Sequence, residues 1–261
     1  MNVLVFDIET IPDIEGGQRI YDLKGLDDKS TAKAMFHLRM QKTGDDFLPL
    51  HLQRIVAISV VYRGMGDDMG HEVSVKSLGD ENSSEAELLN LFFDQIEERT
   101  PTLVSWNGSG FDLPVIHYRT LKNSVSAPGY WEKGENNSAF RHDNYLSRYH
   151  DRHTDLKDVL ASYNNDATAS LDDISTLLGF PGKIGMDGSQ VWDEYQAGNL
   201  GGIRNYCETD VLNTYLVYLR YELMRGELNK EEIGKEYQLL RDNLDDSGQE
   251  HLIQFSQSWT K

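Results

Sequence analysis

The first ten residues combine a short apolar run with two acidic side chains that share one face. Residues 3–8 are mostly apolar and include β-branched side chains, which favours a buried strand. Because side chains alternate across a strand, Asp7 and Glu9 project from the same side of it. An apolar strand seldom carries two acids on one face unless that face meets a cation or water; a solvated strand edge is the alternative. The chain is therefore expected to fold around a strand that presents two carboxylates.

The hydrophobic pattern along the rest of the chain predicts strands first and helices later. Further strands are expected at residues 54–62, 71–77 and 102–106, with a turn at residues 64–68. Helices are expected at residues 29–41, 85–99, 111–121, 155–163, 171–178, 191–195, 199–224 and 230–240. Ser30 or Thr31 is the expected cap of the first helix, and Ser83 or Ser84 of the second, where Glu87 strengthens the capping signal. This order is typical of an α/β fold with a mixed β-sheet flanked by α-helices.

Two further segments add acids far along the chain from the first. NGSGFD, residues 107–112, follows a predicted strand and places Asp112 at the start of a helix, where the helix dipole alone also favours an acid. YCETD, residues 206–210, lies in the longest predicted helix. Tyr206 and Asp210 are four residues apart and share a helix face, although a core tyrosine and a surface aspartate would also explain them. Cys207 lies off that face and is expected to pack inside.

Carboxylates that converge from distant segments can bind metal ions. Hard divalent cations such as Mg²⁺ prefer carboxylate and water oxygens and share them with substrate phosphates. Two such ions roughly 3.5–4 Å apart activate an attacking water and stabilise a leaving oxygen, and no nucleophilic serine or cysteine is needed. The three segments together therefore indicate a two-metal site that cleaves phosphodiester bonds.

The three segments resemble the first, second and third exonuclease motifs of the DEDD 3′–5′ exonuclease superfamily, which has a ribonuclease H-like fold. The resemblance is close to the proofreading exonuclease of family B DNA polymerases, particularly the stand-alone group of predicted exonucleases related to it. A tyrosine four residues before the last aspartate is similar to the tyrosine type, DEDDy. The histidine type would place a histidine at the position of Asn205. The resemblance reaches from residue 1 to residue 224 through these motifs.

The resemblance implies five catalytic residues: Asp7, Glu9, Asp112, Tyr206 and Asp210. The four carboxylates would hold two divalent cations, Mg²⁺ or Mn²⁺. Asp7 would bridge the two ions, and Tyr206 would orient the attacking water through its hydroxyl. Glu9 and Asp210 would complete the ion on the side of the nucleophile, whereas Asp112 would act on the ion near the leaving group.

The same resemblance implies residues that contact the substrate. Thr10 would lie near the terminal 3′-hydroxyl, and Asn107 would contact the substrate backbone. Phe111 is included as a substrate-binding candidate, although packing inside the protein is favoured over stacking on a base. Asp155 and Leu156 resemble an acid–leucine pair between the second and third motifs, which indicates either a role near the site or a helix cap.

The expected organisation is one exonuclease domain with additions. The domain is predicted at residues 1–225, with insertions at about residues 12–53 and 123–152, and a C-terminal helix with a tail at residues 226–261 that is mobile from Asp242 onward. A single cysteine suits a reducing compartment, and neither a signal segment nor an apolar run of about 20 residues is present. A cytoplasmic protein without membrane association is therefore expected.

The net charge of −18 bears on the choice of partner. Because nucleic-acid binders usually neutralise phosphates with basic side chains, this charge argues against nucleic acid. A metal–carboxylate site adds acids that cations neutralise, and the distribution of charge matters more than its sum. In residues 117–155, basic side chains and histidines alternate with tyrosines and other aromatic residues. That mixture is typical of a groove for single-stranded nucleic acid, and an irregular surface loop explains it equally well.

The resemblance implies a metal-dependent 3′–5′ exonuclease. It would hydrolyse phosphodiester bonds at the 3′ end of single-stranded nucleic acid, DNA rather than RNA, and release nucleoside 5′-monophosphates. An exoribonuclease with the same fold is one alternative, and a degenerate module that binds nucleic acid or a partner without cleaving is another. Because 261 residues leave no room for polymerase palm and fingers domains, proofreading would need a separate polymerase or repair partner.

Overall fold

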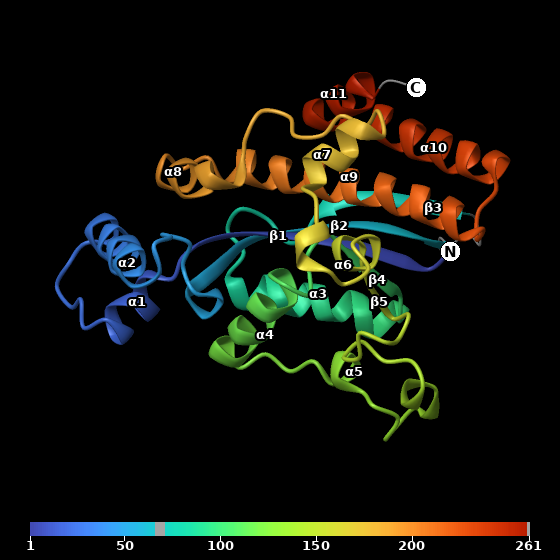
Figure 1. Ribbon diagram of the computed structural model, residues 1–261. Helices are drawn as coiled ribbons and strands as arrows, with labels where there is room; N and C mark the ends of the chain where they lie inside the picture. The colour runs from blue at the N-terminus through green and yellow to red at the C-terminus, as the bar shows by residue number, and fades with distance from the viewer. Residues whose placement is uncertain (66–70, 260–261) are drawn as a thin grey trace.

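A five-stranded mixed sheet forms the centre of the fold. The computed structural model describes residues 1–65 and 71–259, and its strands follow the order β3-β2-β1-β4-β5 (Figure 1). They are β1 (Val3–Pro12), β2 (Gln53–Met65), β3 (His71–Ser77), β4 (Thr102–Ser105) and β5 (His153–Asp155). β2 is antiparallel to β1 and β3, whereas β1, β4 and β5 are parallel. The sheet and its flanking helices confirm the predicted α/β fold and agree with a ribonuclease H-like exonuclease.

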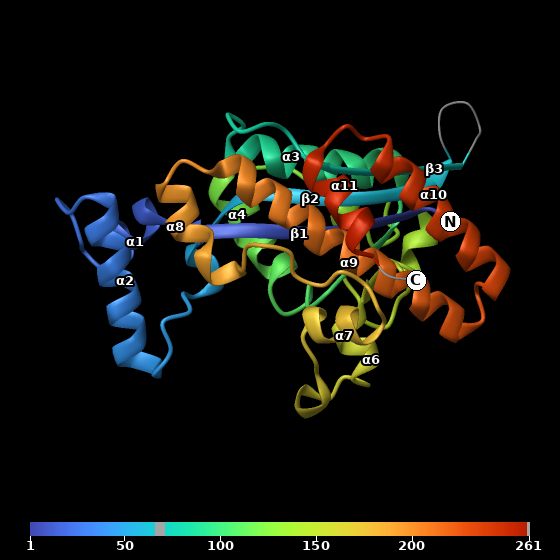
Figure 2. The same cartoon turned by 90° about the horizontal axis from the view of Figure 1, so that it is seen from above.

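Helices cover both faces of the sheet. They are α1 (Ile14–Ile20), α2 (Asp28–Thr43), α3 (Glu85–Arg99), α4 (Asp112–Asn123), α5 (Pro128–Trp131), α6 (Leu156–Leu160), α7 (Leu171–Leu177), α8 (Val191–Gln196), α9 (Leu200–Arg225), α10 (Lys230–Asp245) and α11 (Glu250–Ser258). Short 3₁₀ turns occur at Leu50–Leu52, Ser138–Arg141, Asn165–Ala167 and Gly188–Gln190. α3 and α4 cover one face, and α9 runs along the other with α10 and α11 beyond it (Figures 1 and 2). Within the described ranges, every helix is too short or too polar to cross a membrane.

Alternate residues of β1 face different helices, and this alternation determines which face of the sheet carries Asp7 and Glu9. Leu4 and Phe6 pack in the core cluster that contains the apolar residues of α3 and α4, whereas Val3 and Val5 pack in the cluster of α9. Because side chains alternate along a strand, the odd-numbered Asp7 and Glu9 continue the series on the α9 side. The register of β1 against β2 shifts between Glu9 and Thr10, so a β-bulge immediately follows the two acids.

The ends of several elements differ from the sequence-based expectation. Gly64 and Met65, expected in a turn, belong to β2, and residues 66–68 of that turn lie outside the described residues. Residues 155–163, expected as one helix, contain the last residue of β5, the short helix α6 and a turn at residues 161–163. β5 was missed because its three residues show no apolar alternation, and the strand exists by pairing with β4.

Two helix caps were predicted, one correctly. Ser84 caps α3, and its side chain and that of Glu87 form the expected capping box. α2 begins earlier than expected, because the side chain of Asp27 accepts a hydrogen bond from the backbone N–H of Ser30. The prediction of Ser30 or Thr31 as this cap was wrong, since Thr31 is buried inside the helix.

The segment at residues 12–53 lies beyond one end of the sheet, where α1 and α2 form a separate lobe in Figure 2. Its own small core contains Met35, Leu48 and Leu52. A buried ion-pair network ties this lobe to the domain: Arg119 of α4 contacts Asp13 at 2.6 Å and Glu85 at 2.7 Å. Because all three side chains are below 10% exposed, their pairing is needed to offset the loss of hydration.

The segment at residues 123–152 is only partly a surface loop. Tyr130, Phe140 and Tyr145 are buried in the core cluster of α3 and α4, and the Tyr145 hydroxyl donates a hydrogen bond to the carbonyl of Pro101 at 2.7 Å. These aromatic residues of the segment therefore stabilise the fold and are not available to bind nucleic acid. Tyr149 is different, because it is 82% exposed.

The C-terminal region was expected to be mobile from Asp242 onward, and the structure differs. α10 continues to Asp245, and α11 follows with Leu252 and Phe255 buried in the core cluster of α9. His251 lies 2.7 Å from the Glu208 carboxylate of α9. The polar composition of this region concealed the helical spacing of its few apolar residues. Packing of these residues against the core anchors the segment.

Candidate active site

Three elements bring the acidic segments together. Asp7 and Glu9 come from β1, Asp112 is the first residue of α4, and Asp210 lies on α9. Burial raises the pKa of Asp7 well above its usual value, and repulsion from the other three carboxylates raises it further. The pKa of Glu9 is raised by burial and by repulsion from Asp210 and Asp112. The four carboxylates therefore lie close enough to influence one another electrostatically, and ligand atoms of Asp7, Glu9 and Cys207 lie within 4.8 Å of one another. Their joint binding of metal ions stays a prediction.

The chemistry of this cluster fits divalent cations. The Oδ1 atom of Asp112 is buried and has no hydrogen-bond partner among the residues that the structure describes, which is costly for a carboxylate oxygen unless a cation or water contacts it. Burial raises the pKa of Asp112 to about 7 and that of Asp210 to about 6. Since the donor atoms are all carboxylate oxygens, the cluster suits a hard ion such as Mg²⁺ or Mn²⁺.

Tyr206 lies where a hydroxyl can act on this cluster. It is buried on α9, and interaction with its hydroxyl lowers the pKa of Asp210. Burial, followed by repulsion from Asp210 and Glu9, raises the pKa of Tyr206 far above its usual value. The hydroxyl is therefore protonated, and a protonated phenol can both donate and accept a hydrogen bond.

Cys207 packs inside the protein, as expected, but closer to the acids than the helix-face argument predicted. Its side chain is fully buried, and its Sγ lies 3.4 Å from the carbonyl oxygen of Asp7 and 3.7 Å from Asp7 Oδ2. Burial, followed by the charge of Asp7, raises the pKa of this thiol well above its usual value. Cys207 is thus a neutral packing residue that contacts Asp7 and supports its position.

Lys183 is a site residue that the sequence reasoning missed. Its positive charge lowers the pKa of both Glu9 and Asp210. The preceding residue Gly182, with φ +65°, exchanges two hydrogen bonds with the side chain of Asn213 on α9, and the Lys183 N–H donates to Asp172 at 2.7 Å. A single lysine in a loop without periodicity gives no sequence signal for a functional site. The adjacent Pro-Gly pair indicated a turn at this position and nothing more.

Asp155 holds the second acidic segment in place and also caps α6. Its carboxylate accepts hydrogen bonds from the backbone N–H groups of Asn107 and Ser109 at 2.9 and 2.8 Å, and from that of Lys157 at 3.1 Å. Asn107 has a left-handed backbone with φ 67°, and its side-chain oxygen accepts from Lys157 Nζ at 3.0 Å. The two readings of Asp155, cap or site neighbour, therefore both apply, because one carboxylate does both.

The other substrate-binding candidates have contacts within the protein. The Thr10 hydroxyl donates to the side-chain oxygen of Gln53 at 3.0 Å. Phe111 packs against the core cluster of α3 and α4, and its ring lies 5.9 Å from the half-exposed ring of Phe47. Packing therefore accounts for Phe111, and contact of either residue with substrate stays a prediction.

Comparison with known proteins agrees with this geometry. A family model described as predicted 3′–5′ exonuclease related to the exonuclease domain of PolB matches residues 45–259, well over half of the chain. The chain belongs to this family. Among curated proteins, the search found no match.

The exonuclease family match contains the second and third acidic segments and Lys183, whereas Asp7 and Glu9 precede it. The fold explains how the first segment joins the others. β1 lies between β2 and β4, and both of these strands are within the matched region. The family sheet is therefore continuous only when β1 and its two acids are included.

The metal-free protein is expected to be less stable at about pH 7.5 than at about pH 5. Because the pKa of Asp112 is about 7 and that of Asp210 about 6, the folded state retains protons that the unfolded state releases near pH 4. Stability then falls as pH rises between the two pKa values of each group. Thermal unfolding in EDTA at both pH values measures the fall, and Mg²⁺ at the higher pH is expected to reverse it. A higher melting temperature at pH 7.5 in EDTA would contradict the expectation.

Proposed function

We propose that this protein is a metal-dependent 3′–5′ exonuclease that removes nucleoside 5′-monophosphates from the 3′ end of single-stranded nucleic acid, with DNA favoured. The observation that carries the proposal is the mutual repulsion of four buried or partly buried carboxylates, one of which, Asp112, has a buried Oδ1 without a hydrogen-bond partner among the described residues. Asp7, Glu9, Asp112 and Asp210 would hold two divalent cations. When bound, the ions neutralise these carboxylates, lower the pKa of a water molecule and stabilise the leaving oxygen.

The reaction consumes one water molecule. The water oxygen bonds to the terminal phosphorus while the bond from that phosphorus to the preceding 3′-oxygen breaks. One water proton goes to that 3′-oxygen, so the shortened strand again ends in a hydroxyl, and the other proton is released to solvent. The released nucleotide keeps its phosphate on the 5′-carbon, and the same site can act on the next terminus.

The side chains around the cluster have complementary roles in this proposal. Because the Tyr206 hydroxyl keeps its proton, it can donate a hydrogen bond to Asp210 while its oxygen accepts one from the attacking water and so orients it. Lys183, whose charge reaches Glu9 and Asp210, would offset negative charge that develops on the phosphate. Asn107, fixed by Asp155 and Lys157, would hold the substrate backbone.

A product assay tests the proposal. A 5′-labelled single-stranded DNA incubated with Mg²⁺ or Mn²⁺ is expected to shorten in a ladder, with nucleoside 5′-monophosphates as the small products and no cleavage in EDTA. Release of internal fragments or nucleoside 3′-monophosphates, or no cleavage with either metal, would refute it. A matched RNA strand separates DNA from RNA as substrate, and calorimetric Mn²⁺ binding separates an inactive binding module from an enzyme.

Replacing Tyr206 with phenylalanine is expected to lower kcat by about 100-fold, the lower range for the loss of a group that directs proton transfer. The substitution removes one hydroxyl and keeps the ring in the core. Tyr118→Phe, an exposed site on the same domain, is the matched control and is expected to keep wild-type kcat. Equal kcat for Tyr206→Phe and wild type would exclude the water-orienting role.

A further inference from the structure

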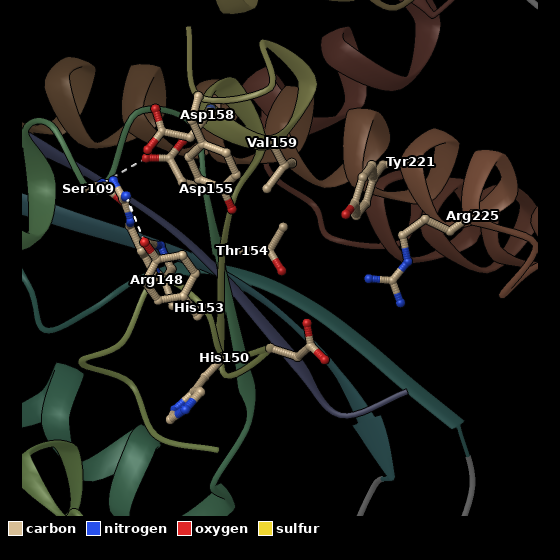
Figure 3. Close-up of a pocket in the computed structure, with 13 residues that line it drawn as sticks. Ser109, Arg148, His150, His153, Thr154, Asp155, Asp158, Val159, Tyr221 and Arg225 are labelled. Carbon is tan, nitrogen blue, oxygen red and sulfur yellow. Dashed lines mark hydrogen bonds between the residues drawn. The ribbon is translucent and has the colours of Figure 1, made fainter. Parts of the chain in front are cut away.

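A groove with a volume of about 220 Å³ opens beside the second acidic segment. Its walls include Ser109 of that segment, Arg148 and Tyr149 from the end of the 123–152 segment, and Arg225 from the end of α9. Figure 3 shows Ser109 and Asp155 on one side and Tyr221 and Arg225 on the other, with Thr154 of β5 between them. The groove therefore lies beside the segment that precedes Asp112.

Exposed aromatic rings line this groove. Tyr149 is 82% exposed and Tyr163 is 53% exposed. The guanidinium of Arg148 lies 5.0 Å from the ring centroid of Tyr149 and 5.8 Å from that of Tyr163, and Arg225 lies 5.2 Å from the ring of Tyr221. Rings paired with guanidinium groups and open to solvent offer faces on which nucleic-acid bases stack, because every base has a π-face.

The charged side chains of the groove include arginines that can contact a nucleic-acid strand, although the surface as a whole is not basic. Arg148 and Arg225 line it together with the acids Asp151, Asp155 and Asp158. Asp155 is occupied by backbone N–H groups of the second segment, and Arg225 contacts its acidic neighbours only loosely, at 3.6 Å. Two guanidinium groups thus remain able to contact phosphates. Base stacking does not depend on a basic surface, so this arrangement is compatible with a net charge of −18.

The position of the groove along α9 relates it to the carboxylate cluster. Tyr221 follows Asp210 by eleven residues on one uninterrupted helix, which corresponds to about 16 Å along the helix axis. We propose that the groove binds the single-stranded part of the substrate that precedes its 3′ end, with bases on Tyr149 and Tyr163 and phosphates on Arg148 and Arg225. This inference rests on the proposed exonuclease function and assigns the path of its substrate.

Binding of a fluorescein-labelled single-stranded deoxyoctanucleotide, measured by fluorescence anisotropy in EDTA, tests the groove without cleavage. Tyr149→Ala is expected to raise Kd at least about fivefold, the lower range for loss of one base–aromatic stack. Arg225→Ala is expected to reduce the slope of log Kd against log salt by about 0.7, the value for one phosphate contact on a single strand. Both side chains are exposed, so the variants are expected to fold.

Two controls match these variants. Tyr118→Ala removes an exposed tyrosine from α4, and Arg19→Ala removes an exposed arginine from α1; both are expected to bind like wild type. Equal Kd values for Tyr149→Ala and wild type, an equal loss in the controls, or no binding by wild type would overturn the groove assignment.

Cleavage with Mg²⁺ separates this result from the proposed function. A dinucleotide is too short to reach the groove, so its hydrolysis is expected to be the same for Tyr149→Ala and wild type. If wild type cleaves neither substrate while Tyr149→Ala still loses affinity, the nuclease function is wrong and the groove stands. If cleavage occurs and Kd is unchanged, the groove is wrong and the nuclease function stands.

Discussion

Asp7→Asn is expected to abolish exonuclease activity and, at the same time, to stabilise the metal-free protein. Activity is expected to fall more than about 100-fold, since weakening even an indirect partner of a metal ligand costs 10- to 100-fold. Stability is expected to rise near pH 7.5, because asparagine removes a largely desolvated charge that three other carboxylates repel. The protein thus holds these acids together at a cost that bound cations would offset.

Steady-state cleavage with Mg²⁺ and thermal unfolding in EDTA measure the two effects. Asp22→Asn changes the same functional group at a site where the side chain is 90% exposed, and is expected to change neither quantity. Activity of Asp7→Asn close to wild type would exclude the role of Asp7 in the site. A fall in metal-free stability would show that repulsion among the carboxylates does not dominate there.

Arg119→Met is expected to destabilise the protein by about 3–5 kcal/mol, the typical effect of removing one partner from a buried ion pair. Arg119 Nη1 lies 2.6 Å from Asp13, and its Nε lies 2.7 Å from Glu85, so methionine would leave two buried carboxylates without this partner. Because Asp13 directly follows β1, the lobe of α1 and α2 would lose one of its ion pairs with α4 and keep the pairing of Lys122 with Asp13 and Glu15.

Urea unfolding of Arg119→Met and of Arg19→Met measures the effect. Arg19 is exposed and pairs with Glu15 on the surface, so its replacement is expected to change stability by less than about 1 kcal/mol. Adding Glu85→Gln to Arg119→Met is expected to recover part of the loss, because it removes one unpaired charge. Equal stability of the two methionine variants would show that the network contributes nothing net.

Two pairs of the predicted site residues follow from regular periods, whereas Asp112 was included through the motif that its segment resembles. Asp7 and Glu9 share a strand face, and Tyr206 and Asp210 share a helix face, so each pair keeps its geometry wherever the element lies. Lys183 follows no such period. It reaches the cluster because Asn213 fixes the adjacent Gly182, and this is a tertiary contact between segments some thirty residues apart.

The elements that were missed also depend on tertiary contacts. β5 has three residues and becomes a strand only beside β4, and α11 is anchored by His251 on Glu208, a partner 43 residues earlier. The aromatic residues near position 140 gave an ambiguous signal, because composition does not distinguish a buried ring from an exposed one. Tyr145 and Tyr149 lie four residues apart in the same segment, and one is in the core while the other faces solvent.

α9 carries Tyr206 and Asp210 near its start and Tyr221 and Arg225 near its end, without interruption. With the groove occupied as proposed, this rigid helix fixes the separation between the nucleotide that is removed and the nucleotides that are held. A span of about 16 Å corresponds to about five nucleotides at the 3.4 Å spacing of a stacked strand. Fragments shorter than about five nucleotides would then not reach from the acidic site to the groove and would bind more weakly. Digestion is therefore expected to slow at a defined oligonucleotide length.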